Sequence, residues 1–228
     1  MEARLRENIG HGEVFRLAWP IMISMLSYTA MTVADSIFVA QLGTAQLAAL
    51  GLAATGVHLL NAFPVGLLGG ARVQIAQAFG AGDTARARAL AWQGVYIALG
   101  FGVIVAALVP FAGIFTVLLG AGGELAAHGT AYLRVRILSA PLVFGMFALQ
   151  AWYQGRGDTR TPMVAVVIAN AVNIGLDPFF IFGWGGLPEL GVQGAAIATG
   201  IALIVQNLVL FAPAAREFLA HRVGVRRD

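Results

Sequence analysis

The chain has 228 residues, of which 59% are hydrophobic and only 11% charged, whereas soluble domains carry about 25% charged residues. A soluble fold of this size could not bury so much apolar surface, so we expect an integral membrane protein. The chain contains no cysteine, which excludes disulfides and thiolate metal sites. Arginine supplies all of the Lys/Arg charge, mostly in short loops between apolar stretches, which indicates topology rather than nucleic-acid binding.

Six apolar stretches are long enough for helices that cross a bilayer, which takes about 20 residues. In chain order we place them at 15–40, 46–71, 89–118, 129–153, 162–183 and 191–214. Residues 1–14 then form an N-terminal segment, 15–214 a six-helix transmembrane lobe, and 215–228 a tail or the start of a linker. The runs lack the alternation of a membrane β-barrel. The sequence therefore predicts an all-α membrane protein with six transmembrane helices.

Arginine is concentrated on alternate connections between the expected spans. It occurs in the N-terminal segment, after the second and fourth spans and in the tail, whereas connections 41–45, 119–128 and 184–190 have none. Because positively charged loops stay in the cytoplasm, we expect both termini there. Arg134 and Arg136, just inside the fourth span, oppose this pattern.

Two glycine-rich segments repeat one pattern after the second and fourth spans. Residues 80–84 are Gly-Ala-Gly-Asp-Thr, and residues 155–159 are Gly-Arg-Gly-Asp-Thr. Glycine permits a tight chain reversal, and aspartate or threonine can cap the next helix. Pro162 then suits the first turn of that helix. No lysine follows and no strand is expected before, so we interpret both segments as turns with helix caps rather than phosphate-binding loops.

Two aspartates, Asp35 and Asp177, lie inside expected spans, each in the second half of an outward-running helix. A charged side chain at the bilayer centre costs at least about 2.5–3.5 kcal/mol, so such a residue is a functional candidate by default. The alternative is a carboxylate near enough to the interface to reach water. Asn170, Asn173 and Asp177 are spaced i, i+3 and i+7, which places them on one face of the fifth span.

This polar face has the ligands of a hard cation. Pro178 cannot donate a backbone hydrogen bond to the Ile174 carbonyl, which frees an acceptor near Asp177. Carboxylate, amide and carbonyl oxygens together suit Na⁺ or a proton relay. Three further polar residues extend the candidate site onto the first and sixth spans: Tyr28, Thr32 and Thr199.

Two other residues are candidates for a cavity or a hinge. Pro20 lies early in the first span, where it either kinks the helix or occupies its first turns. Gln150 lies near the end of the fourth span, where it either lines a cavity or anchors the helix at the interface. We find no catalytic triad, no His/Glu metal spacing and no nucleotide-binding loop, so we expect neither an enzyme nor a bound cofactor.

Six segments extend over nearly the whole chain in a characteristic order: residues 19–22, 34–43, 77–83, 154–162, 173–183 and 191–199. Each is a loose motif alone. Together they resemble the N-terminal lobe of the MATE family, the multidrug and toxic compound extrusion transporters.

The resemblance implies a Na⁺- or H⁺-coupled antiporter that exports amphipathic, often cationic compounds. In bacterial members a cation site combines a span-one aspartate, a span-five asparagine and aspartate, and a span-six threonine. These match Asp35, Asn173, Asp177 and Thr199, and the bending of the first span in that family maps to Pro20. The resemblance further implies a multi-pass protein of a bacterial inner membrane, whose partners are the bilayer and a small amphipathic substrate, and not nucleic acid.

The family has twelve spans in two lobes, whereas six are expected here. A truncated lobe, a split transporter with a separate second lobe and a half-size homodimer each explain the difference. Two other functions stay open. One is a flippase for lipid-linked precursors, which needs a cationic cavity; here only Arg72, Arg134 and Arg136 approach the membrane interior. The other is a non-transporting membrane subunit or inactive fragment.

Overall fold

The computed structural model of the chain describes residues 11–222, and within this range it is all-helical, with no β-strand. The expected terminal segments lie partly outside the described residues, namely at 1–10 and 223–228. The elements are α1 (His11–Ala40), α2 (Thr44–Gly80), α3 (Thr84–Ala106), η2 (Val109–Phe111), α4 (Ala112–Leu118), α5 (Gly123–Leu138), α6 (Ala140–Gly155), α7 (Arg160–Phe182), η3 (Trp184–Gly186) and α8 (Val192–Arg222).

Five of these helices are long and apolar enough to cross a membrane, and a bent pair gives the sixth span. The expected fourth span is not one straight helix, because α5 and α6 meet at an angle of 47° around Ser139. Pro141 is the second residue of α6, where its missing backbone N–H is tolerated only because a new helix begins there.

The expected third span is also divided. The α-helix of this span ends at Ala106, and a short 3₁₀ turn then leads into the separate helix α4. Pro110 lies in that turn and disfavours the α conformation at the residue before it. The continuous helix expected over 89–118 is therefore wrong beyond Ala106.

The two repeated turns have the predicted structure. The Asp83 side chain accepts the backbone N–H of Arg86 at 2.9 Å, so it caps α3. The Asp158 side chain accepts the backbone N–H of Thr161 at 3.0 Å in the first turn of α7. Gly82 and Gly157 have φ of 78° and 81°, a left-handed conformation that a side chain would strain.

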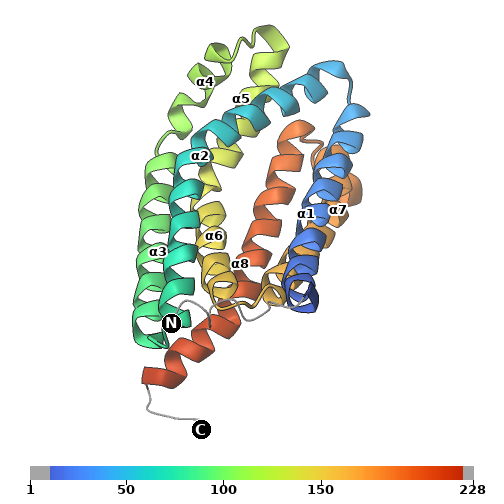
Figure 1. Cartoon of the computed structure of the whole chain (residues 1–228). Coiled ribbons are helices and arrows are strands. Elements are labelled where there is room, and N and C mark those ends of the chain that lie inside the picture. The colour runs from blue at the N-terminus through green and yellow to red at the C-terminus, as the bar shows by residue number, and fades with distance from the viewer. Residues whose placement is uncertain (1–10, 223–228) are drawn as a thin grey trace.

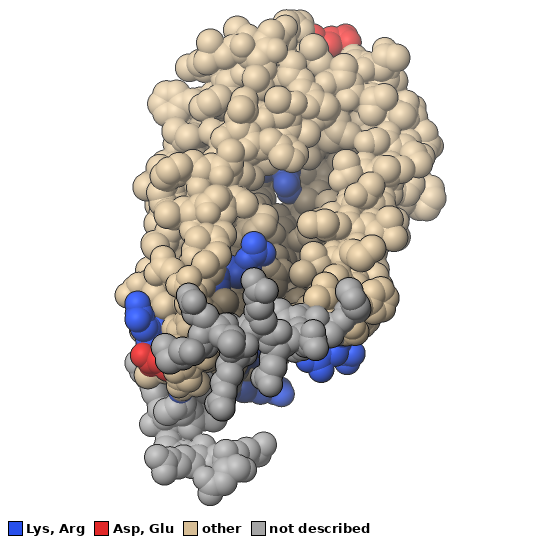
Figure 2. All heavy atoms as spheres, in the orientation of Figure 1, with Lys and Arg blue, Asp and Glu red and all other residues tan. Residues whose placement is uncertain are grey.

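The helices form two groups (Figure 1), and the molecule is hollowed between them on the face that the space-filling view shows (Figure 2). Helices α2, α3 and α6 pack together on one side, α1 packs along α7 on the other, and α8 contacts α5, α6 and α7. Helix α1 begins and α8 ends at the same end of the bundle (Figure 1).

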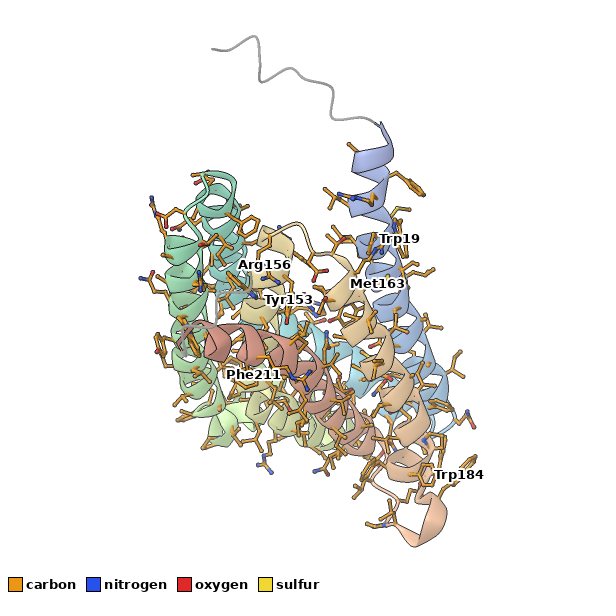
Figure 3. All side chains as sticks on the ribbon, turned by 90° about the horizontal axis from the view of Figure 1, so that it is seen from below. Trp19, Tyr153, Arg156, Met163, Trp184 and Phe211 are labelled. Carbon is orange, nitrogen blue, oxygen red and sulfur yellow. The ribbon has the colours of Figure 1, made fainter. Side chains whose placement is uncertain are left out.

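The end view shows Trp19 of α1 near Met163 of α7, and Arg156 near Tyr153 (Figure 3). The guanidinium of Arg156 lies 4.5 Å from the Trp152 ring centroid.

Candidate functional site

The four residues of the expected cation site come from three helices and lie together in the protein. Asp35 is on α1, Asn173 and Asp177 are on α7, and Thr199 is on α8. All four are buried: Asn173 and Asp177 are fully inaccessible, and Asp35 and Thr199 are 7% and 6% exposed. Asp35 also lines a cavity, whereas Asp177 has no accessible surface.

The Asn173 amide connects the three helices. In the orientation that satisfies both of its atoms, the amide nitrogen donates to Asp35 Oδ1 at 3.0 Å. The amide oxygen then accepts the backbone N–H of Thr199 at 3.2 Å. The Thr199 hydroxyl donates to the Ala195 carbonyl at 2.8 Å, which leaves its lone pairs free to face the site.

Asp177 is the residue of this cluster whose hydrogen-bonding capacity is least satisfied. Both of its carboxyl oxygens are buried, and among the described residues only the carboxyl group of Asp35, if one of the two is protonated, is within hydrogen-bonding reach. Its neighbour is the carboxyl group of Asp35, with which it interacts electrostatically. Two ionised carboxylates are acceptors only and repel one another. A proton shared between them, or a bound cation, would provide the missing interaction.

Close packing of α7 and α8 places Thr199 within reach of Asn173. Gly194 lies against the backbone of Phe180 and Ile181, so closely that a β-carbon would overlap it. The alanines that follow, Ala195, Ala196 and Ala198, are completely buried. Small side chains let two helix backbones approach, as they do in membrane bundles generally.

Three adjoining cavities lie in the hollow between the two groups of helices. The main cavity, about 440 Å³, is bounded by α1, α2, α5, α6, α7 and α8. The Asp35 cavity, about 250 Å³, shares Thr32, His58, Arg136 and Thr199 with it. The Arg72 cavity, about 480 Å³, shares Tyr28 with the main one. Basic atoms are visible inside the hollow on this face (Figure 2).

The other predicted residues take different places around these cavities. Tyr28, Thr32 and Asn170 line the main cavity, and Gln150 lines the Arg72 cavity. Asn170 is hydrogen-bonded to Ser27 of α1 at 2.7 Å, away from the four-residue cluster.

Pro20 lies inside α1, near the start of the candidate membrane span Val14–Ala40. It is buried, and α1 runs through it as one helix. Both interpretations from sequence, a kink at Pro20 and a place in the first turns of the span, stay predictions.

One polar residue was missed by the sequence analysis. Gln206 of α8 is 2% exposed, lines the main cavity and donates to the Tyr28 hydroxyl at 3.0 Å. Two adjacent amides, Gln206 and Asn207, inside an apolar span are the signal that could have identified it.

Comparison with known proteins places these observations in a family. The family model described as MatE matches residues 20–179. The chain is 35% identical over 195 residues to a probable multidrug resistance protein NorM of Thermotoga maritima, covering 85% of this chain and 42% of that protein. It is 27% identical over 196 residues to an FAD transporter of Shewanella oneidensis, covering 84% and 43%.

The fold agrees with the sequence comparison. A multidrug resistance MATE family transporter of the MOP superfamily, solved in an outward-facing conformation, superposes with a TM-score of 0.79 at 32% identity, over 94% of this chain and 45% of that one. The chain thus spans less than half the length of these relatives. It belongs to the MATE family and corresponds to the N-terminal lobe of that family's transporters.

Proposed function

We propose that this chain is the cation-coupled lobe of an exporter of amphipathic compounds, with Na⁺ or H⁺ bound at Asp35, Asn173, Asp177 and Thr199. The observation that carries the proposal is the Asp177 carboxyl group, which is buried against a second buried aspartate and has no other hydrogen-bond partner in the described part of the chain. An uncompensated buried charge costs several kcal/mol. Proteins keep such groups in membrane helices where a coupling ion occupies them.

The ligand chemistry of the cluster fits a hard monovalent cation. Two carboxylates and a hydroxyl supply oxygens from α1, α7 and α8. Binding a proton or Na⁺ there removes negative charge between α1 and α7, which favours one packing of these helices over another. A ligand shifts such an equilibrium only by its different affinities for the two states. Coupling then means that the cation and the exported compound prefer different packings.

Cation binding can be measured on the chain itself, with radiolabelled Na⁺ and with the infrared band of protonated carboxyl groups. If the site binds Na⁺, we expect Asp177→Asn to abolish binding of radiolabelled Na⁺. If it binds H⁺ instead, we expect the variant to lose the infrared band of the protonated carboxyl group. Asp83→Asn is the matched control, because Asp83 is exposed at a helix start and asparagine caps as well as aspartate. If Asp177→Asn changes neither signal, the cation site is wrong.

Export is tested in a two-lobe context, with this chain joined to or co-expressed with a second six-helix lobe. Asp35→Asn and Asp177→Asn should then abolish coupled efflux at equal expression. Unchanged export by both variants would refute the coupling role. Because the chain spans less than half of its relatives, a second lobe or a second copy is part of this proposal as a partner.

The arginines give less support to a flippase for lipid-linked precursors. Arg134 is exposed and lies in a separate depression with Pro110, away from the main cavity. Arg72 lines its own cavity and donates to Gln154 at 2.9 Å. Only Arg136 faces the main cavity, so the three charges do not converge on one pyrophosphate-sized site.

A further inference from the structure

The main cavity has a different charge from the neighbouring acidic cluster. Among its lining residues, all within the described part of the chain, Arg136 is the one permanently charged side chain, and none is acidic. Asp35 lines the adjoining Asp35 cavity instead, and Asp177 lines neither. A ligand in the main cavity therefore meets a guanidinium first, with the carboxylates behind it.

The guanidinium of Arg136 has hydrogen-bonding capacity that the protein leaves unused. Its Nε and Nη1 atoms are buried and have no hydrogen-bond partner among the described residues. A guanidinium binds a carboxylate or phosphate with two parallel bonds through its two Nη atoms, or through Nε and Nη2. Asp35 interacts with Arg136 electrostatically, but its Oδ1 already accepts from Asn173.

The remaining wall of the cavity is suited to an amphipathic molecule. Met31, Val143, Met146, Phe147 and Leu203 provide apolar surface around the arginine. A volume of about 440 Å³ is in the range of sites that bury drug-sized ligands, which are mostly apolar with a few placed polar groups.

From this arrangement we infer that the main cavity binds amphipathic organic acids, whose carboxylate, sulfonate or phosphate is held by the guanidinium of Arg136. This ligand class differs from the cationic compounds that the family resemblance implies. The inference deepens the proposed export function by naming a charge class. The binding event itself requires neither transport nor cation coupling, so the two can fail separately.

The test uses two dyes of one skeleton, anionic 8-anilinonaphthalene-1-sulfonate and its neutral relative N-phenyl-1-naphthylamine. Isothermal titration into nanodiscs of zwitterionic lipid containing the full chain, minus empty discs, gives both affinities. We expect the wild-type chain to bind the sulfonate at least tenfold more tightly than the neutral dye. Equal affinities, or a preference for the neutral dye, would overturn the inference without any variant.

Variants then assign the effect to one side chain. Arg136→Gln should weaken sulfonate binding about tenfold or more and leave the neutral dye unchanged, because a charge-assisted double hydrogen bond is lost. Arg136→Lys keeps the charge and should lose less. Arg134→Gln is the matched control, since Arg134 is exposed on the same helix two residues away. Equal losses in the Arg136→Gln and Arg134→Gln variants would point to surface charge alone and would refute the assignment.

A second arm distinguishes a soluble acid from a lipid headgroup. If phosphatidylglycerol in the disc competes with the sulfonate in the wild-type chain, but not in Arg136→Gln, then an anionic lipid can occupy the same site at Arg136. If it does not compete, the site takes soluble acids only. In both cases the acidic group at Arg136 is the recognised feature. Competition that persists in Arg136→Gln would overturn this role.

Discussion

Replacing Gly194 by alanine tests whether close contact of α7 and α8 builds the cation site. A β-carbon at Gly194 would lie 2.8 Å from the backbone nitrogen of Ile181 and nearer still to the Phe180 carbonyl, closer than real β-carbons lie. Because these are backbone atoms, no side chain can move aside, and α8 must shift away from α7. That shift would lengthen the Asn173–Thr199 contact.

The expected destabilisation follows from two opposing terms. Overpacking a well-packed interface costs about 1–3 kcal/mol. Replacing a helical glycine by alanine recovers about 0.5–1 kcal/mol. The net loss is about 0–2.5 kcal/mol in the free energy of unfolding, or about 1–3 kcal/mol relative to a glycine-to-alanine change without the overlap. About 1.4 kcal/mol corresponds to a tenfold change in the unfolding equilibrium constant.

The assay is denaturant unfolding in mixed micelles, followed by tryptophan fluorescence. Gly175→Ala is the matched control, because Gly175 is on α7, two residues from Asn173, and a β-carbon there meets no atom within 4 Å. The control should be neutral or slightly stabilising. If Gly194→Ala is as stable as Gly175→Ala, the tight approach of the two helices is not what holds this site.

Two further predictions concern single hydrogen bonds. Asp83→Ala removes the cap of α3, whose side chain accepts a backbone N–H at 2.9 Å, and should cost about 1 kcal/mol, measured by the same unfolding assay. Asp83→Asn, which keeps the acceptor, should restore it. Gln206→Leu leaves the Tyr28 hydroxyl without its donor at 3.0 Å and should also cost about 1 kcal/mol. The double change Gln206→Leu with Tyr28→Phe should cost less than the sum of the single changes; additive losses would show that the two groups do not interact.

The sequence predicted the helical membrane fold and a set of candidate site residues. It did not predict where helices break or which helices pack against one another. Apolar length alone predicted the long helices α1, α2, α7 and α8, and the Gly-Asp turns predicted caps that Asp83 and Asp158 provide. It did not predict the breaks, although Pro110 and Pro141 mark them, because apolar length carries no information on helix direction.

The spacing of Asn170, Asn173 and Asp177 correctly indicated one helix, but spacing alone could not show which helices pack against it. The hydrogen bonds separate the roles of these residues: Asn173 joins α1 to α8, whereas Asn170 is bonded to Ser27. The place of Arg136 at the wall shared by two cavities likewise required the packing of α5 against α2 and α8. The role of the four-residue cluster in cation binding remains a prediction.

The bend at Ser139 divides one wall of the main cavity between two helices. Arg136 lies one helical turn before the bend, on α5, while Val143 and Met146 lie after it, on α6. The charged and apolar parts of one cavity therefore lie on two different helices, α5 and α6, which meet at Ser139. The 47° angle between α5 and α6 therefore sets the distance from the Arg136 guanidinium to the apolar wall on α6. The length of a ligand that can touch both parts depends on this angle rather than on any one side chain.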